Sequence, residues 1–367
     1  MIETSARTDL TLRDIVARPV NVPMRRPLTT ASGALQSVAL VLIDVHTDAG
    51  ITGHAYLFSF FDRSSKAMCE ILSDMAALLA GKSIAPAGIR AALAQRYKLI
   101  ALDGIINMCA AGIDVAAWDI LAKAHELPLA GLLGAEVRPI PAYNSNGLGI
   151  MKASKSVDEA QELVDEGFGA IKLRLRHATL EQDLKVVRAV RKAIPDDVLL
   201  MSDYNQGLTL AEARRRCAAL DGEGLYWIEE PLRHDDYGGA AALAAATTTP
   251  IQIGENFVGA RAMAQAIAAG AADYMMPDLE RIGGVSGWIE AAALANTAGI
   301  PLSTHLFPEV SAHLMCVTPT AHYLEYVDWA NPILAEPIRI HASCALPSNN
   351  PGVGLAWNEE AVTKYGV

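Results

Sequence analysis

Short apolar segments in the second half of the chain each end in a polar residue, and these endings recur at regular distances. The polar residues that follow the apolar segments are Lys172, Asp203, Glu229, Glu255, Asp278, His305 and Glu325. Successive members of this series lie 31, 26, 26, 23, 27 and 20 residues apart. A strand, a helix and two loops take up roughly 25–30 residues, so each step corresponds to about one βα unit. The pattern predicts a (β/α) barrel that carries these side chains at the carboxyl ends of its strands.

Signals for helix starts and helix ends fall between the predicted barrel strands. The first of these strands is expected over residues 139–145. Three capping boxes follow it, formed by Ser156 with Glu159, Thr179 with Gln182, and Thr209 with Glu212. Glycines that suit a left-handed helix end stand at positions 167, 222, 270 and 299. This alternation of strand and helix signals supports the barrel.

The first part of the chain has a different pattern. Strands are predicted over residues 12–22 and 37–46, and a turn at residues 48–50 leads into a third apolar run. The small and polar residues between the first two strands predict a loop with Gly33 as its pivot. Periodic apolar residues then predict helices over residues 62–81, 86–98 and 107–126. A small antiparallel sheet with a helical layer, an α+β domain, is therefore expected.

The length of the chain predicts more than one domain, because 367 residues exceed what one ordinary core supports. We expect an N-terminal α+β domain over residues 1–135, a barrel over residues 136–330, and a segment over residues 331–367 that returns to the first domain. A hydrophobic content of 51% with 19% charged residues is typical of a well-buried globular protein. The formal net charge of −11 argues against a nucleic-acid partner, which would need a basic face.

Cysteine usage and the N-terminal sequence predict a cytoplasmic location. The five cysteines are odd in number, widely scattered and without metal-binding spacing, which indicates free thiols in a reducing compartment. The opening residues MIETSARTDL lack a basic region followed by an apolar run, so no signal peptide is expected. Alanine-rich stretches such as AALAAA are too short and too interrupted to span a bilayer. We therefore expect a soluble protein with no membrane partner.

Asp203, Glu229 and Glu255 are the candidate metal ligands. Three carboxylates that meet at a barrel mouth repel one another unless a cation lies between them. Oxygen ligands without a nearby histidine or cysteine favour a hard cation, and Mg²⁺ fits best. Strand alternation turns Glu230 away from Glu229, and Pro231 ends that strand. The alternative for any single strand-end carboxylate is that it is solvated or caps the next helix.

Lys172 and Arg174 lie two residues apart on one predicted strand, so they share a face and can offset the surplus negative charge of the carboxylates. A substrate carboxylate would then contact both the metal and Lys172. Taken alone, the KLRLR segment would also fit an exposed edge strand.

His305 and Asp278 come from consecutive βα units. A carboxylate against the far imidazole nitrogen fixes the tautomer and raises the basicity of the ring, so His305 is the candidate acid–base group. The chemistry that uses all of these residues is removal of the proton next to a substrate carboxylate. Mg²⁺ and Lys172 would stabilise the resulting enediolate, and a protonated Glu325 would donate a hydrogen bond to it.

The segments KLR, SDYNQ, WIEEP, GEN, MMPDLERIGG and STHLFPEVSAH, in this order and spacing, resemble those of the mandelate racemase subgroup of the enolase superfamily. The likeness extends to NVP, ASG, GHAYLF and AAGIDVAAWD nearer the N-terminus. It implies an α/β fold in which an N-terminal α+β capping domain covers a modified (β/α)7β TIM-like barrel. It also implies a small-molecule carboxylate substrate and a homo-oligomer, often an octamer.

The resemblance also implies roles for individual residues. Mg²⁺ would be held by Asp203, Glu229 and Glu255, with a His305–Asp278 dyad opposite and Arg281 close to the dyad. Lys172 and Glu325 would contact the substrate carboxylate, with Ser145 and Asn205 nearby. The mostly apolar pocket positions of the family are matched by Leu28, Leu35, Phe58, Phe60 and Leu306. Specificity would then depend on the loops around residues 25–35 and 56–63.

One departure from the family leaves the outcome of the reaction open. Mandelate racemase carries a second lysine where this chain has Arg174, and a guanidinium, with a pKa above about 12, is a poor general base. With His305 as the only base, we favour syn dehydration of a 2,3-dihydroxy acid sugar, and Arg174 would hold a polyol or a distal carboxylate. The apolar pocket positions instead favour a racemase or epimerase of an apolar or aromatic 2-hydroxy acid. A third alternative is a metal- or sugar-acid-binding paralogue without turnover.

Overall fold

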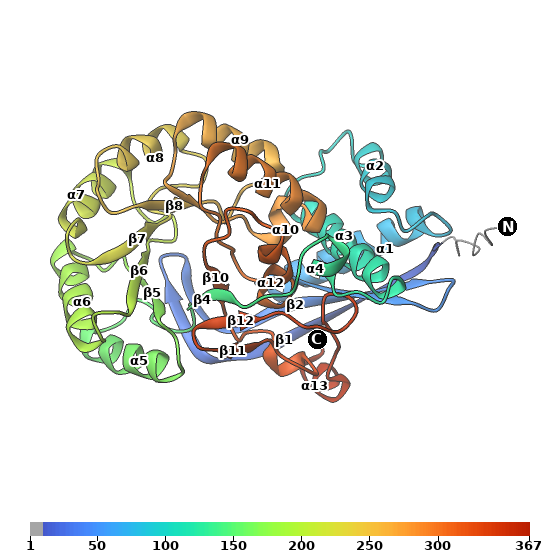
Figure 1. Cartoon of the computed structure of the whole chain (residues 1–367), viewed down its shortest axis with the longest axis horizontal. Coiled ribbons are helices and arrows are strands. Elements are labelled where there is room, and N and C mark those ends of the chain that lie inside the picture. The colour runs from blue at the N-terminus through green and yellow to red at the C-terminus, as the bar shows by residue number, and fades with distance from the viewer. Residues whose placement is uncertain (1–9) are drawn as a thin grey trace.

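The computed structural model describes residues 10–367 and has two parts (Figure 1). A three-stranded antiparallel sheet packs against helices, and a second sheet of mainly parallel strands closes into a barrel ringed by helices. This arrangement confirms the predicted fold class of a modified barrel with an N-terminal α+β capping domain. The expectation about a signal peptide concerns residues that lie largely outside the described part of the chain.

The N-terminal sheet contains β1 (Leu12–Thr30), β2 (Gly33–Thr47) and β3 (Thr52–Phe58) in that order. The loop predicted between the first two strands is wrong, because β1 and β2 continue as a long hairpin whose pairing runs to Thr30 and Gly33. Gly33 does form the pivot, with a φ of 132°. A register shift between Pro23 and Leu28 interrupts the ladder. Prolines on this edge strand cannot donate backbone hydrogen bonds, so the sequence pattern did not predict that the pairing continues.

The helices of this domain are α1 (Asp62–Leu79), α2 (Pro86–Arg96), α3 (Gly104–Ala124) and α4 (Leu129–Leu132). The first three match the predicted helices. Helix α3 is long and apolar enough to cross a membrane, but 67% of its apolar window is buried, as in the core helix of a globular protein. It packs closely on β3, because a Cβ atom added at Gly53 would lie only 2.1 Å from the carbonyl oxygen of Ala116.

The barrel is formed by parallel strands that follow one another around the ring. They are β4 (Ile140–Asn144), β5 (Ala170–Arg174), β6 (Leu199–Asp203), β7 (Leu225–Glu229), β8 (Ile251–Ile253), β9 (Tyr274–Met275) and β10 (Leu324–Tyr326). Strand β10 pairs with β4 and closes the ring. Single bridges from Leu302 to Met275 and to Ala321 join the segment that leads to His305. Lys172 and Glu325 lie in the middle of their strands, and the other predicted polar residues lie at or just beyond the carboxyl ends.

Helices cover the outside of the barrel. They are α5 (Ala153–Asp165), α6 (Leu180–Ala193), α7 (Leu210–Leu220), α8 (Tyr237–Ala244), α9 (Gly259–Ala269), α10 (Leu279–Ile282), α11 (Gly284–Ala298) and α12 (Pro308–Cys316). The capping boxes at Thr179 and Thr209 are confirmed. The box at Ser156 is wrong: α5 begins earlier, so Ser156 lies inside it, and Glu159 accepts a hydrogen bond from the backbone of Leu148. A serine and a glutamate three residues apart also share one face inside a helix, so this spacing alone does not mark the start of a helix.

The C-terminal segment contacts both parts of the protein. It contains η1 (Asn331–Ile333), β11 (Arg339–His341), β12 (Cys344–Leu346) and α13 (Glu359–Tyr365). Strand β12 pairs antiparallel with β4, which adds a hairpin to the barrel sheet. Beyond it, Trp357 donates to Asp44 at 2.6 Å, and Arg18 forms an ion pair with Glu359 at 2.6 Å. The residue limits of the three domains stay predictions.

The close contact between α3 and β3 predicts the effect of one methyl group. Gly53→Ala should lower the free energy of unfolding by about 1–3 kcal/mol, because the added Cβ atom meets backbone that cannot move aside. Gly88→Ala is the matched control, since no atom lies within 4 Å of its added Cβ and alanine favours the α2 helix. Urea unfolding followed by circular dichroism measures both variants. Equal stability of the two variants would contradict the packing argument.

Candidate active site

A cavity of about 570 Å³ lies at the carboxyl ends of the barrel strands, beneath the tip of the β1–β2 hairpin. The barrel contributes polar lining residues: Lys172, Arg174, Arg176, Asp203, Asn205, Gln206, Glu255, Arg281, His305 and Glu325. The N-terminal domain contributes mainly apolar and small residues, which include Leu28, Leu35, Phe60 and Phe61. One face of the cavity is therefore charged, and the facing wall is largely apolar.

Lys172 is the centre of the charged face. Its side chain is buried, and its ammonium group lies 2.9 Å from Glu325 and 3.5 Å from Asp203. It also forms an ion pair with Glu229. Burial alone would lower the pKa of Lys172, but the three carboxylates raise it above its usual value, so the group stays charged. Its partners come from β6, β7 and β10, which is why distant parts of the sequence meet here.

The carboxylates around Lys172 carry more negative charge than the lysine offsets. Asp203 and Glu229 are paired residues of neighbouring strands in the barrel ladder. Burial raises the pKa of Glu229, and the nearby charges of Asp203 and Glu325 raise it further, while Lys172 opposes them. Because the ionised form of these carboxylates is destabilised, an additional positive charge would stabilise the site.

Glu255, the third predicted ligand, lies at the edge of this group. One of its oxygens accepts a hydrogen bond from Gln206 at 2.8 Å, and the other lies 3.4 Å from His305 Nε2. Within residues 10–367, no three acidic, histidine or cysteine side chains are already gathered at metal-binding distances. The all-oxygen donor set and its surplus negative charge fit a hard divalent cation, but Glu255 must turn away from His305 to join the other two carboxylates.

The predicted His305–Asp278 pair is formed in the structure. Nδ1 of His305 lies 2.7 Å from an oxygen of the buried Asp278, and Nε2 faces the charged side of the cavity. Asp278 also accepts from the backbone of Glu280 and Arg281, and Arg281 Nη1 lies 3.2 Å from it. Burial lowers the pKa of His305, but Glu325, Asp278 and Glu255 outweigh this and raise it.

Glu325 differs from the prediction of a protonated hydrogen-bond donor. It accepts from the backbone N–H of Leu306 at 2.9 Å and pairs with Lys172. Burial raises the pKa of Glu325, but the charges of Lys172 and His305 are stronger and hold it well below its ordinary value. In this structure Glu325 accepts hydrogen bonds, and the sequence did not predict its direct ion pair with Lys172.

Arg174 lies in the cavity wall, and its Nη atoms donate hydrogen bonds to the loop after β4. Nη1 donates to the carbonyl oxygens of Ser145 at 2.7 Å and Gly147 at 2.9 Å, and Nη2 donates to Ser145 Oγ at 2.8 Å. Ser145 is fully buried and supports Arg174 instead of facing the cavity. Ser145 is not among the residues that line the cavity, and its place near the substrate stays a prediction.

The predicted apolar residues divide into two groups. Leu28, Leu35, Phe60 and Leu306 line the cavity, as expected. Phe58 lies behind the wall and is fully buried, with its ring 5.9 Å from Phe60 and 5.0 Å from Phe307. Phe58 is not among the residues that line the cavity, and its contact with the substrate stays a prediction.

Asn205 lines the cavity as predicted, and its side chain donates to Asp203 at 2.8 Å.

Sequence reasoning missed Arg176, although the alternation of Lys172, Arg174 and Arg176 along one face was a usable signal. Arg176 has a φ of 94°, and its Nε donates to the carbonyl oxygen of Gly207 at 2.6 Å. A Cβ atom at position 207 would lie 2.3 Å from the Arg176 side chain, so a larger residue there would displace that side chain. Trp329 and Phe61, which extend the apolar wall, were also missed.

Comparisons with known proteins identify the family of the chain. Residues 12–134 match the N-terminal domain of mandelate racemase / muconate lactonizing enzyme, and residues 155–361 match an enolase C-terminal domain-like family. The chain is 30% identical to L-talarate/galactarate dehydratase of Salmonella typhimurium, a match that covers 98% of this chain and 91% of the relative. Other relatives are cycloisomerases and racemases.

Two solved structures are more similar in sequence. An enolase from alphaproteobacterium BAL199 with bound magnesium is 43% identical, with a TM-score of 0.96 over 98% of this chain and all of that one. An enolase from Bradyrhizobium in complex with magnesium and mandelic acid is 42% identical, with a TM-score of 0.94 over 98% of this chain and 99% of that one. The chain therefore belongs to the mandelate racemase / muconate lactonizing enzyme family, and it is a lyase or isomerase of the enolase superfamily.

Proposed function

We propose that this protein removes the α-proton of a 2-hydroxycarboxylate in a Mg²⁺-dependent reaction and dehydrates an acid sugar. The observation that carries the proposal is the His305–Asp278 pair, held at 2.7 Å, which shares one cavity with the buried Lys172–carboxylate cluster. The first group is suited to move a proton, and the second is suited to hold a substrate carboxylate. Relatives that bind magnesium and carboxylate ligands support the same assignment.

Asp203, Glu229 and Glu255 are the residues that would hold Mg²⁺. When bound, the ion supplies positive charge that makes the α-proton of a coordinated carboxylate more acidic. Lys172 then donates hydrogen bonds to the same end of the substrate, where its buried ammonium group offsets the charge that develops during proton removal.

His305 acts as the base and then as the acid. Nε2 accepts the α-proton, and Asp278 stabilises the imidazolium through Nδ1. The same nitrogen then delivers the proton to the departing β-hydroxyl, so that water leaves and the enol product rearranges to a 2-keto acid. Arg174 does not replace the second base, because a guanidinium is a poor proton acceptor and its hydrogen bonds go to Ser145 and Gly147. One base on one side of the substrate favours syn elimination over racemisation.

A racemase or epimerase of an apolar 2-hydroxy acid is the second candidate. The apolar wall formed by Leu28, Phe60 and Leu306 favours it, because an aromatic substituent would pack there. The mandelic acid complex of the Bradyrhizobium relative supports the same reading. Dehydration remains our preference, since inversion needs a proton donor on the face opposite His305. The cytoplasmic location and the octameric assembly stay predictions.

Arg176 supports a substrate with a second carboxylate. It lies at the exposed end of the Lys172–Arg174–Arg176 row, and its backbone N–H donates to Asp183 at 3.2 Å. The ion pairs found within residues 10–367 do not include it, so its guanidinium remains able to bind an external anion. A dicarboxylic acid sugar, held at one end by Lys172, would present its other end to Arg176.

Proton NMR in D₂O tests the reaction itself. With Mg²⁺ and a library of acid sugars and aromatic 2-hydroxy acids, we expect a 2-keto product from at least one acid sugar. His305→Asn should slow that reaction about a hundred- to ten-thousand-fold, because the base is lost, while Mg²⁺ affinity is kept. An α-proton that exchanges without any keto product would contradict dehydration, and exchange retained in the variant would exclude His305.

Removal of one ligand carboxylate tests the metal assignment. Glu229→Gln should weaken Mg²⁺ binding at least about tenfold, because an anionic oxygen ligand is replaced by a neutral one. Isothermal titration calorimetry measures the change. Glu290→Gln, at an exposed position of α11, is the matched control and should bind like the wild type. Unchanged affinity in Glu229→Gln would contradict the ligand set.

Substitution of Arg176 tests the substrate class. Arg176→Met should raise KM for a dicarboxylic acid sugar about ten- to a hundredfold, because one charge-assisted contact is lost. For a monocarboxylic acid sugar, KM should change less than about threefold. Steady-state kinetics of keto-acid formation supplies both values. An equal rise in KM for the two substrates would show that Arg176 does not bind a distal carboxylate.

A further inference from the structure

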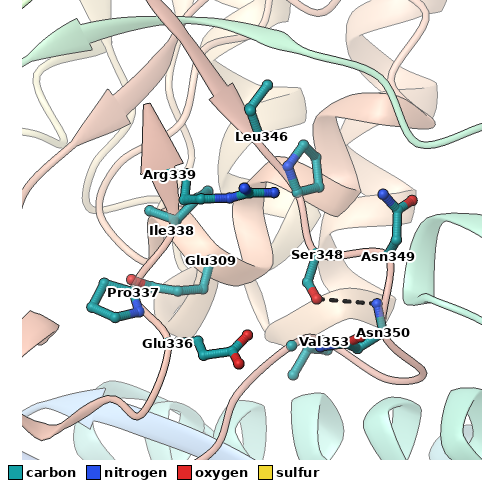
Figure 2. Close-up of a pocket in the computed structure, with 12 residues that line it drawn as sticks. Glu309, Glu336, Pro337, Ile338, Arg339, Leu346, Ser348, Asn349, Asn350 and Val353 are labelled. Atoms are coloured by element: carbon teal, nitrogen blue, oxygen red, sulfur yellow. Dashed lines mark hydrogen bonds between the residues drawn. The ribbon is translucent and has the colours of Figure 1, made fainter. Parts of the chain in front are cut away.

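Two cavities of similar volume differ in how their polar side chains are held. The cavity in Figure 2, of about 580 Å³, lies between α12 and the C-terminal segment, and two of its charged residues, Glu336 and Arg339, are exposed to solvent. Part of its wall is held only locally, by a hydrogen bond of 3.1 Å from the backbone of Asn350 to Ser348 Oγ (Figure 2). In the active-site cavity, of about 570 Å³, polar side chains instead form hydrogen bonds between separate loops, and Gln206 connects three of them.

Gln206 lies in the loop after β6 and is hydrogen-bonded to the loops after β7 and β8. Its Nε2 atom donates to Glu255 Oε1 at 2.8 Å and to Asn256 Oδ1 at 2.7 Å. Its Oε1 atom accepts from the backbone N–H of His234 at 3.0 Å. One side chain therefore connects the ends of all three strands that supply the candidate metal ligands.

The partners of Gln206 fix the orientation of its amide group. The backbone N–H of His234 can only donate and the carboxylate of Glu255 can only accept, so the amide oxygen must face the first and the amide nitrogen the second. Because the amide is neutral, it holds Glu255 without a charge that would compete with a cation. The backbone at Asn205 and Gln206 is left-handed, with φ values of 42° and 60°. Such strained conformations persist where surrounding contacts hold them, and they cluster at functional sites.

Glu230 holds the backbone of the loop after β8. Its side chain is buried, and one carboxyl oxygen accepts from the backbone N–H of Gly254 at 2.7 Å and from that of Glu255 at 3.3 Å. The backbone of Glu255 is thus held without Gln206. The contact with Gln206 therefore acts on the direction of the Glu255 side chain.

We propose that Gln206 is a positioning residue for Glu255. The inference rests on the proposed metal assignment, in which Glu255 is one of three carboxylates that bind Mg²⁺. Gln206 holds Oε1 of this carboxylate, so that Oε2, which lies 3.4 Å from His305 Nε2, is the oxygen left to turn toward the cation. Without the hydrogen bond from Gln206, the Glu255 side chain would populate several rotamers, and metal binding would have to order it.

Calorimetric titration of the whole chain with Mg²⁺ alone tests the proposal. Gln206→Met keeps the length of the side chain but removes its donor, so Mg²⁺ binding should weaken about ten- to a hundredfold. Gln206→Asn should weaken binding to a similar extent, because its shorter amide does not reach Glu255. Asparagine also suits the left-handed backbone, so this variant keeps the test valid if Gln206→Met does not fold.

Gln95→Met, at an exposed position of α2, is the matched control and should bind Mg²⁺ like the wild type. Circular dichroism checks that each variant is folded. Unchanged or tighter Mg²⁺ binding in either folded Gln206 variant would overturn the proposal.

A double-mutant cycle separates this role from a general structural one. If Gln206 acts through Glu255, Gln206→Met should weaken Mg²⁺ binding less than about twofold in a protein that already carries Glu255→Ala. An equal loss in both backgrounds would overturn the proposal, because the effect would not pass through Glu255.

The Glu255→Ala variant alone tests the metal assignment and should weaken Mg²⁺ binding about tenfold or more. Normal binding in that variant would overturn the assignment and with it the role of Gln206. A loss in Glu255→Ala together with normal binding in Gln206→Met would overturn the role of Gln206 alone.

Discussion

The buried ammonium group of Lys172 lies among carboxylates from three other barrel strands, and much of the site follows from that balance of charge. Asp203, Glu229 and Glu325 each contact it, yet one lysine cannot offset three anions. Burial raises the pKa of Glu229, and the charges of Asp203 and Glu325 raise it further. A divalent cation held by Asp203, Glu229 and Glu255 would relieve this surplus, and in the proposed reaction Lys172 would contact the substrate carboxylate. Binding and catalysis thus depend on the same charges.

The capping domain and the barrel contribute different properties to the cavity. Barrel strands supply the charged groups, since the carboxyl ends of parallel strands converge on one rim. The β1–β2 hairpin reaches over this rim and brings Leu28 and Leu35 opposite them. A covered, partly apolar cavity excludes water and strengthens the electrostatic contacts inside it. In the proposed reaction, proton transfer is therefore carried out by barrel residues, while the hairpin supplies part of the apolar wall of the cavity.

The sequence allowed the strand-end residues to be predicted, because the βα period places them on one rim. The helix caps at Thr179 and Thr209 could also be predicted, because a capping box is local in sequence. Contacts between distant segments could not be predicted: Arg174 donates a hydrogen bond to Ser145, Lys172 forms an ion pair with Glu325, and Glu255 lies against His305. Such contacts depend on side-chain rotamers and on which strands become neighbours in space. A local pattern contains neither.

The most direct measurement for this account is a crystal structure of the protein grown with Mg²⁺ and an unreactive 2-hydroxycarboxylate. We predict that Glu255 leaves His305 and joins Asp203 and Glu229 around a single metal ion, and that Lys172 contacts the ligand carboxylate. His305 should keep its bond to Asp278 and place Nε2 toward the α-carbon. A metal ion bound elsewhere, or a Glu255 that stays against His305 in the presence of the ligand, would contradict the account.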